Sequence, residues 1–548
     1  MIAALDKALQ GTADQLGMDV DPLKLMVTLF ASYPLCGLMK RLPDDRPVLK
    51  KLFCLSVSAF YLLGVFDLGE GVRTLLVCSM GAYAAAKYVR SPWMPWAVFV
   101  VSMLHLMANH LYHAWYVNPD GKMDITGAHM VLVMKTTAFA WNVADGRRPE
   151  RELSALQRDR ALRALPPVLD YLTYVFFFPS LLIGPSFDFA EFARWLDLSM
   201  FDEPARTRGG KPRRRIPRSG RVATLKAAEG VLYVALWVAL TPTFSAEAVL
   251  GDGFMTHNVV YRIFFLWPLN IVYRLKYYGA WSLAEGACIL SGLGYNGRDD
   301  KGRARWDRVR NIDPVRFETG QNTFTLLEKW NMNTNKWLKS YVYLRVTPAG
   351  RKPGFRSTMA TFCASAFWHG IHPGYYLTFV TGAFMQTCGK YSRRYIRPFF
   401  LTPDLSGPGP YKRYFDFVSW VAVQLGIAYT VQPFVILGFY DSMRLWARVW
   451  FYGHVVLFSM MIVFSTGVRK TIEGRLRERS KTASKLDQIK YEAEQSRMRA
   501  GHSPALGIPD TDLDELREGV EEDMRELRKD IETLRARSRR TQSKIASA

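Results

Sequence analysis

Long apolar stretches recur along this chain of 548 residues and constrain its fold more than any other feature. Each is close to the length that an α-helix needs to cross about 30 Å of hydrocarbon. They lie at 23–41, 50–67, 74–89, 94–118, 125–143, 168–187, 228–250, 257–279, 356–390, 412–440 and 446–466. The interior of a lipid bilayer offers no water to hydrogen-bond with backbone polar groups. Segments of this length satisfy those groups by forming helices, in which the hydrogen bonds are internal. We therefore predict an all-α polytopic membrane protein with roughly ten or eleven transmembrane or re-entrant helices.

Basic residues gather in the polar segments between the apolar stretches. The formal net charge is +23, from 72 Lys and Arg against 49 Asp and Glu, while the mean hydropathy stays near zero at −0.04. The excess lies at 147–163, 206–221, 298–310 and 469–485. Because basic loops are typical of the cytoplasmic side of membrane proteins, we expect these segments to face the cytoplasm. We do not expect a nucleic-acid partner.

The composition changes near residue 467. Residues 1–467 are predicted to form one membrane core, since no linker divides them, and residues 468–548 a charged cytosolic tail. Within the tail, a helix at about 511–535 is indicated by apolar residues spaced three and four apart. These are Leu513, Leu516, Val520, Met524, Leu527, Ile531 and Leu534. This helix could mediate self-association or could be a solvated amphipathic helix, and the sequence favours neither alternative.

Cysteines and histidines in the apolar stretches do not form a recognised metal motif. The six cysteines have no C-x-x-C pair, so we expect buried small apolar residues rather than disulfides or a zinc site. His110 and His113 are three residues apart and lie near His105 and His129. No carboxylate stands beside them within the predicted span, so we interpret this group as packing histidines and expect no bound metal.

Another histidine lies in the sequence Phe-Trp-His-Gly, which ends a run of mostly small, apolar residues. His369 lies between Trp368 and Gly370. A polar group retained in such surroundings costs several kcal/mol unless it has a role. An imidazole, with its ordinary pKa of about 6.5, suits the removal of a proton from a hydroxyl near neutral pH. Asn331, in a segment rich in amides and aromatic residues, is a candidate to orient that imidazole or to polarise a carbonyl.

These segments together resemble the membrane-bound O-acyltransferase family, and within it the lysophospholipid acyltransferase branch of fungal type. The resemblance lies in several stretches that follow one another in the expected order between about residues 120 and 380. They are Asp124–Ala128 with Met134–Lys135 and Trp141–Asn142, Phe178–Phe187, Arg274–Tyr278 with Trp281 and Glu285, Trp330–Asn331 with Trp337–Leu338 and Tyr341–Arg345, and Ser365–Gly370 with Pro373–Tyr376. The charged tail carries no such match.

The resemblance implies a helical membrane core around a substrate tunnel, residence in the endoplasmic reticulum, and transfer of a fatty acyl group from acyl-CoA to a lipid hydroxyl. It implies that His369 is the general base and Asn331 its partner, with no permanently bound cofactor. Residues that would bind the substrates follow from it. Trp330, Asn335, Trp337 and Trp368 would shape the pocket, and Glu318 and Asn322 would line its polar wall. Because acyl-CoA is polyanionic, Lys135, Arg274 and Lys276 are candidates to meet its phosphates, and ordinary snorkelling or topology residues are the open alternative.

Two alternatives stay open at this point. The acceptor could be a sterol, a diacylglycerol or a protein side chain, although the residue before Trp330 is Lys329 where the sterol and diacylglycerol branch is expected to have a second tryptophan. A transporter or scaffold without catalysis is the other alternative. His372 is a departure from the expected pattern, since many relatives would have an aromatic or aliphatic residue there. Head-group and acyl-chain preference do not follow from the sequence.

Overall fold

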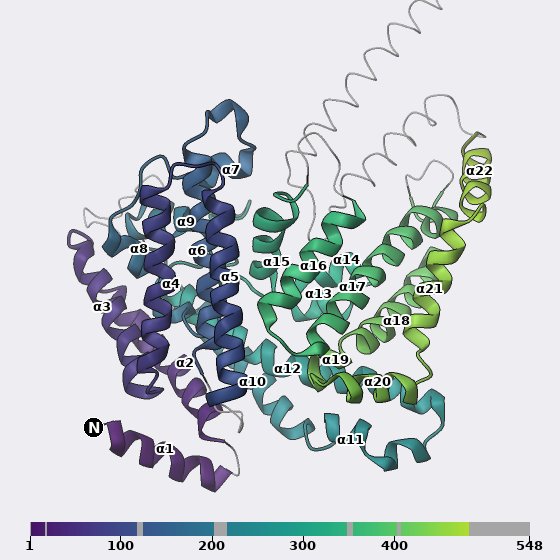
Figure 1. The fold of residues 1–548 in the computed structure, drawn as a ribbon, viewed down its shortest axis with the longest axis horizontal. Helices are drawn as coiled ribbons and strands as arrows, with labels where there is room; N and C mark the ends of the chain where they lie inside the picture. The colour runs from purple at the N-terminus through teal and green to yellow at the C-terminus, as the bar shows by residue number, and fades with distance from the viewer. Residues whose placement is uncertain are drawn as a thin grey trace, which may run out of the picture.

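The computed structural model describes residues 2–16, 19–117, 124–201, 216–347, 354–402 and 407–481, and these are overwhelmingly helical. Within these ranges the only extended pairings are two isolated bridges, Arg298 with Ala304 and Leu401 with Pro408. Figure 1 shows the helices as two neighbouring groups, one formed by the first part of the chain and one by the last. The prediction of an all-α membrane protein is confirmed.

The first group contains the N-terminal part of the chain (Figure 1). Its helices are α1 (Ile2–Leu16), α2 (Val20–Met39), α3 (Pro47–Ala59), α4 (Gly69–Tyr88), α5 (Met94–Tyr112), α6 (Thr126–Gly146), α7 (Ala155–Arg160), α8 (Val168–Val175) and α9 (Phe189–Leu196). π-helical turns at Phe60–Val65 and His113–Val117 extend α3 and α5.

A central segment lies between the two groups along the chain. The central segment contains α10 (Gly220–Leu240), α11 (Ala246–Leu250) and α12 (Val259–Ser291). The second group contains α13 (Pro314–Glu318), α14 (Thr323–Lys329), α15 (Met332–Leu338), α16 (Phe355–His369), α17 (Pro373–Tyr391), α18 (Lys412–Thr430), α19 (Gln432–Ile436), α20 (Phe439–Arg448), α21 (Tyr452–Ser465) and α22 (Val468–Lys481).

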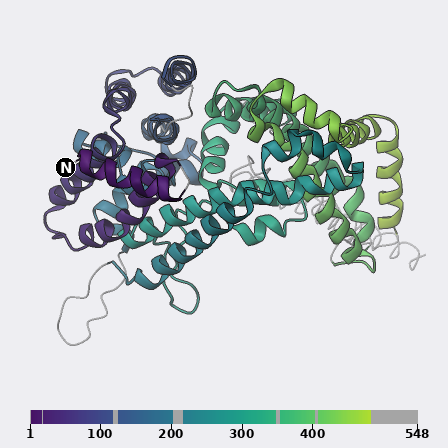
Figure 2. The same cartoon turned by 90° about the horizontal axis from the view of Figure 1, so that it is seen from below.

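Helix α12 connects the two groups. It begins with the Asn258 side chain capping the amide of Tyr261 and ends at Gly292, whose positive φ of 100° stops the helix. It contacts α2 and α10 along part of its length and α18 and α19 along another. The teal helices of this central segment run side by side through the molecule in Figure 2. The core is therefore organised around α12.

The crossing of α10 and α12 depends on two glycines. A Cβ atom at Gly230 would stand 3.0 Å from the carbonyl oxygen of Gly279, and one at Gly279 would stand 3.1 Å from the carbonyl oxygen of Gly230. Small residues let helix backbones approach closely inside a membrane. This reciprocal contact explains why two mostly apolar helices pack so tightly here.

Within the described residues, five helical segments are long and apolar enough to cross a membrane, and a sixth is possible if the bent pair α20 and α21 forms one span. The five are Val20–Met39, Pro47–Val65, Met94–Tyr116, Gly220–Leu240 and Lys412–Ile436. The sequence estimate of ten or eleven also included the regions of α4, α6, α12, α16 and α17. These helices are present, but they carry polar side chains, several of them buried within the protein.

Two of the predicted apolar stretches are not continuous helices. The stretch 356–390 folds into α16 and α17, broken at Gly370. The stretch 168–187 is helical only as far as Val175, continues through a short 3-10 turn at Phe178–Ser180, and contains a cis peptide bond before Pro185. Proline and glycine interrupt the helices in both places, which a count of apolar residues does not detect.

The charged tail is described only at its start. Helix α22 begins at Val468, just after the boundary predicted at residue 467. The predicted helix at about 511–535 lies outside the described residues, as does most of the basic loop at 206–221. Five of the six cysteines are buried, as predicted, whereas Cys363 is exposed.

Candidate active site

The structure places His369 at the junction of two neighbouring helices. Helix α16 ends at His369, Gly370 has a positive φ of 127°, and α17 begins at Pro373. Glycine adopts such a φ without the steric penalty that a Cβ atom brings, and proline is favoured in the first turn of a helix. The sequence after His369 therefore ends one helix and starts the next, which fixes the position of the imidazole.

Aromatic rings surround the His369 side chain. Its ring centroid is 5.2 Å from that of Phe379, 5.0 Å from Phe434 and 5.5 Å from Tyr375. The side chain is half-buried. No hydrogen bond to the imidazole is formed by any described residue, so its nitrogens are available to an incoming hydroxyl. An imidazole held by ring packing alone keeps its lone pair for chemistry.

Helices α5 and α6 support the end of α16. Nε2 of His110 lies 3.3 Å from the carbonyl oxygen of Trp368, and the indole Nε1 of Trp368 donates to the carbonyl oxygen of Met130 at 3.0 Å. Trp368 is buried, with 4% of its surface exposed. His110, one of the four histidines grouped in the sequence analysis above, thus contacts the residue that precedes His369.

We predict that Gly370→Ala lowers acyl transfer by about 10-fold to 100-fold, since small displacements of catalytic groups have effects of that size. A Cβ atom at Gly370 would meet Nδ1 of His110 at 3.0 Å, in a backbone conformation that alanine rarely adopts. Gly354→Ala is the matched control, because a Cβ there meets nothing within 4 Å. Equal initial rates for the two variants, measured on folded protein, would contradict this prediction.

Asn331 lies between α14 and α15 in a left-handed conformation with φ 41° and ψ 54°. Asparagine tolerates this region better than most residues. The backbone around it is fixed: its carbonyl accepts from the amide of Asn335 at 2.9 Å, and the amide of Met332 donates to Asn311 O at 2.7 Å. Among the described residues, no hydrogen bond joins the half-buried Asn331 amide to His369 or to another side chain.

Aromatic rings also pack beside Asn331. The ring of Trp330 lies 5.8 Å from Tyr277 and 5.2 Å from Trp281, both on α12. Asn331 thus follows a residue packed in one aromatic cluster, while the rings of Tyr375, Phe379 and Phe434 form an aromatic wall around His369. Apolar surroundings of this kind suit substrates with fatty chains.

Trp337 and Asn335 support the site through hydrogen bonds within the protein. The Trp337 indole donates to Thr137 Oγ1 on α6 at 2.9 Å, and its ring lies 6.0 Å from that of Trp368. The Asn335 amide donates to the Leu327 carbonyl oxygen at 3.0 Å. Trp337 thus connects α15 to α6, the helix whose Met130 carbonyl oxygen also accepts from Trp368. Asn335 connects α15 to α14 across the bend between them.

Arg274 and Glu318, proposed separately for phosphate binding and for the polar wall, bind each other. The guanidinium donates to both carboxylate oxygens, at 2.8 and 2.7 Å, and the Tyr278 hydroxyl donates to the same carboxylate at 2.7 Å. Asn322 is exposed and caps α14 by accepting from the Thr325 amide at 2.9 Å. All three predicted site residues thus have hydrogen-bond partners within the protein.

Lys135 also has internal partners. Its ammonium is fully buried and donates to the Tyr174 carbonyl oxygen at 2.9 Å and to Ser180 Oγ at 3.1 Å. Lys135 and Arg274, both predicted to meet phosphates, thus each have hydrogen-bond partners inside the bundle. Lys276 differs from them, since it is half-buried and its ammonium lies 5.1 Å from the Tyr277 ring centroid.

The rings around His369 were not predicted from the sequence. Tyr375 and Phe379 are four residues apart on α17, so they share a helix face, and this spacing after Pro373 is a signal that could have identified them. Phe434 on α19 follows His369 by 65 positions, and no local pattern connects the two. His110 was recognised as part of a histidine group, but its contact with the carbonyl of Trp368 was not.

Comparison with known proteins identifies the family. The model of the membrane-bound O-acyltransferase family matches residues 110–432, more than half of the chain, and the match includes both His369 and Asn331. The chain belongs to the membrane-bound O-acyltransferase family. The match begins at His110 on α5 and ends at Gln432, the first residue of α19, so it includes Tyr375 and Phe379 but stops just before Phe434.

Several characterised members of the membrane-bound O-acyltransferase family are similar over most of their length. The lysophospholipid acyltransferase of Schizosaccharomyces pombe is 44% identical over 85% of this chain and 90% of its own. The lysophospholipid acyltransferase of Saccharomyces cerevisiae is 45% identical over 85% of this chain and 77% of its own. The human membrane-bound glycerophospholipid O-acyltransferase 2 is 30% identical over 64% of this chain and 65% of its own.

Proposed function

We propose that this protein transfers a fatty acyl group from acyl-CoA to the free hydroxyl of a lysophospholipid. The observation that carries the proposal is the His369 imidazole, which lies among aromatic rings at a helix junction and hydrogen-bonds to no described residue. Similarity to two fungal lysophospholipid acyltransferases at 44% and 45% identity supports the choice of acceptor. The membrane of the endoplasmic reticulum, with the charged tail in the cytoplasm, is the proposed location.

In the proposed mechanism the lysophospholipid hydroxyl gives its proton to a nitrogen of His369. The oxygen forms a bond with the thioester carbonyl carbon, the carbon–sulfur bond breaks, and the thiolate of coenzyme A takes the proton from the imidazolium. No covalent enzyme intermediate is needed, because the thioester is already activated. Holding two amphiphilic substrates in one orientation supplies much of the rate enhancement.

Asn331 is proposed to orient His369 or to donate a hydrogen bond to the developing oxyanion. We predict that Asn331→Ala lowers the rate by about 100-fold or more, the usual effect of losing one such donor. Asn331→Gly distinguishes the amide from the backbone, because glycine keeps the left-handed φ of 41° without strain. The glycine variant should be as slow as the alanine variant. Recovery of activity in Asn331→Gly would show that only the backbone conformation matters.

The acceptor is tested by following coenzyme A release from oleoyl-CoA with purified protein in detergent. Lysophospholipids with choline, ethanolamine, serine, inositol and no head-group alcohol form one set of acceptors, and a sterol and a diacylglycerol form the other. Release with one or more lysophospholipids and none with the second set is expected. Release with the sterol or the diacylglycerol alone would assign a different acceptor, and release with none would contradict the acyltransferase proposal.

A further inference from the structure

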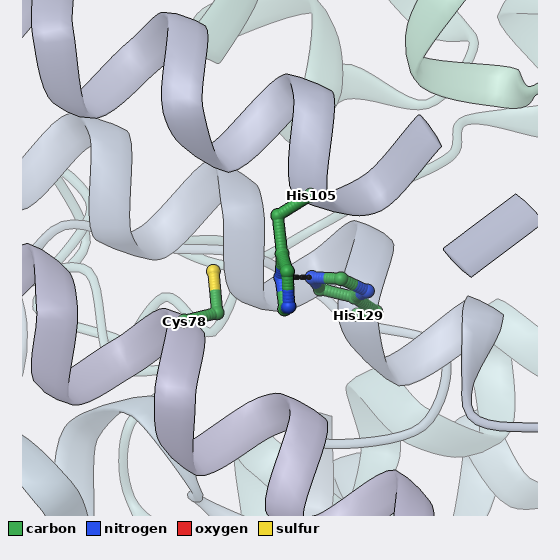
Figure 3. Close-up of side chains that lie close together, drawn as sticks. All are labelled: Cys78, His105 and His129. Atoms are coloured by element: carbon green, nitrogen blue, oxygen red, sulfur yellow. Dashed lines mark hydrogen bonds between the residues drawn. The ribbon is translucent and has the colours of Figure 1, made fainter. Parts of the chain in front are cut away.

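A thiol and two imidazoles meet where α4, α5 and α6 pack together. Cys78 on α4, His105 on α5 and His129 on α6 each offer one ligand atom, and these atoms lie within 4.8 Å of one another (Figure 3). Nδ1 of His105 is 3.1 Å from Nε2 of His129. Two nitrogens bound to one ion at about 2.0 Å in tetrahedral geometry are about 3.3 Å apart. The two rings therefore already have nearly the spacing of ligands to a shared ion.

The cluster lies mostly inside the protein. His129 is fully buried and Cys78 is 8% exposed, while His105 is half-buried. Nδ1 of His105 and Nε2 of His129 are within hydrogen-bond distance of each other, and an ion bound by both nitrogens would replace that hydrogen bond. Three potential ligands from three separate helices thus meet at one buried place in the bundle.

No carboxylate belongs to the cluster. The nearby Asp124 accepts hydrogen bonds from the amide and the hydroxyl of Thr126 at 2.8 Å each, and it pairs with His113 at 3.3 Å. His110 and His113, the histidines three residues apart, are engaged elsewhere, His110 with the Trp368 carbonyl oxygen and His113 with Asp124. Cys78 has no C-x-x-C partner in the sequence, and only the fold brings two imidazoles near its thiol.

We propose that Cys78, His105 and His129 bind one thiophilic metal ion. Thiolate and imidazole donors select zinc(II) and copper(I) over magnesium and calcium, which prefer oxygen. Binding converts the Cys78 thiol to a thiolate and releases its proton. With one thiolate the copper(I) complex is neutral, whereas the zinc(II) complex keeps one positive charge. Because an uncompensated charge is costly in apolar surroundings, copper(I) is expected to bind more tightly.

The ion would join the helices that hold the candidate active site in place. Its three ligands come from α4, α5 and α6, and the last two also contact Trp368 through His110 and Met130. The metal site is distinct from His369 and takes no part in proton transfer. The inference therefore does not depend on the proposed acyl transfer, and its test does not measure that activity.

The test uses the full chain, purified in detergent with a reductant and stripped of metal with a chelator. One arm is titrated with zinc(II), and the other with copper(I) held by a competing chelator. The metal retained after gel filtration is counted per chain. One ion per wild-type chain is expected in at least one arm, and the arm in which it is retained identifies the ion.

Variants decide whether the ion is bound at this cluster. Cys78→Ser and His129→Gln should weaken binding by about 10-fold or more. Cys388→Ser is the matched control, since Cys388 is another buried cysteine whose thiol faces the Leu457 carbonyl oxygen on a different helix pair. It should bind like the wild type. Two independent ligand variants keep the test decisive if one of them does not fold. Retention of no ion in either arm, or unchanged binding by the folded ligand variants, would overturn the proposal.

Discussion

Replacing His369 by alanine should reduce lysophospholipid-dependent acyl transfer by about 100-fold to 10,000-fold, the range that general base catalysis supplies. The imidazole is the group that would accept the hydroxyl proton, and no hydrogen bond to a described residue competes for its nitrogens. Initial rates with saturating oleoyl-CoA, measured at equal amounts of folded protein, give the comparison. The loss should appear mainly in kcat, because the acyl chains and head group are bound elsewhere.

His372→Ala is the control for this prediction. His372 is exposed and stands three residues from His369, at the start of α17. Its imidazole is 5.9 Å from Tyr375 between ring centroids and contacts the aromatic wall only at its edge. The His372 variant should retain most of the activity. A large loss in His372→Ala together with normal rates in His369→Ala would reassign the general base to His372.

Breaking the ion pair between Arg274 and Glu318 should have the largest effect on stability. Arg274→Met leaves the Glu318 carboxylate without its cation, and removal of one partner from a buried pair costs about 3–5 kcal/mol. The Glu318 side chain is 27% exposed, which places the expected loss near the lower end of this range. Unfolding in detergent, followed by heat or denaturant, measures the change.

The double variant Arg274→Met with Glu318→Gln should lose less stability than the sum of the two single variants, because neither charge is then left alone. The exposed pair of Arg148 and Glu152, at 3.4 Å, provides the matched control. Arg148→Met should change the stability by less than about 1 kcal/mol. Two results together would show that the Arg274–Glu318 contact is not a buried structural link. One is an equal loss of stability in Arg274→Met and Arg148→Met, and the other is a loss in the double variant equal to the sum of its two single losses.

Local sequence signals predicted the helices well. The apolar stretches at 23–41 and 94–118 correspond to α2 and to α5 with its π-helical extension, because hydrophobic length is a property of a continuous segment. The breaks were harder to predict. Gly370 interrupts the stretch 356–390 only because its backbone adopts a positive φ, and a glycine inside an apolar run does not always do so.

Partners distant in the sequence could not be predicted in the same way. Glu318 and Arg274 were each given a separate role toward substrate, one in the polar wall and one at the phosphates. Nothing in the sequence pairs two residues 44 positions apart. The same holds for Asp145 and Arg345, which form a buried ion pair with a distance of 3.0 Å over 200 positions. His369 was identified because its local sequence alone is unusual.

The most direct test of the account is detection of the product. Purified protein is given oleoyl-CoA with a deuterated acyl chain and one lysophospholipid, and mass spectrometry follows the labelled diacyl phospholipid together with free coenzyme A. We predict one labelled phospholipid for each coenzyme A released by the wild type, and formation of both products at least about 100-fold more slowly with His369→Ala. Formation of labelled phospholipid at the wild-type rate by the folded His369 variant would contradict the central claim.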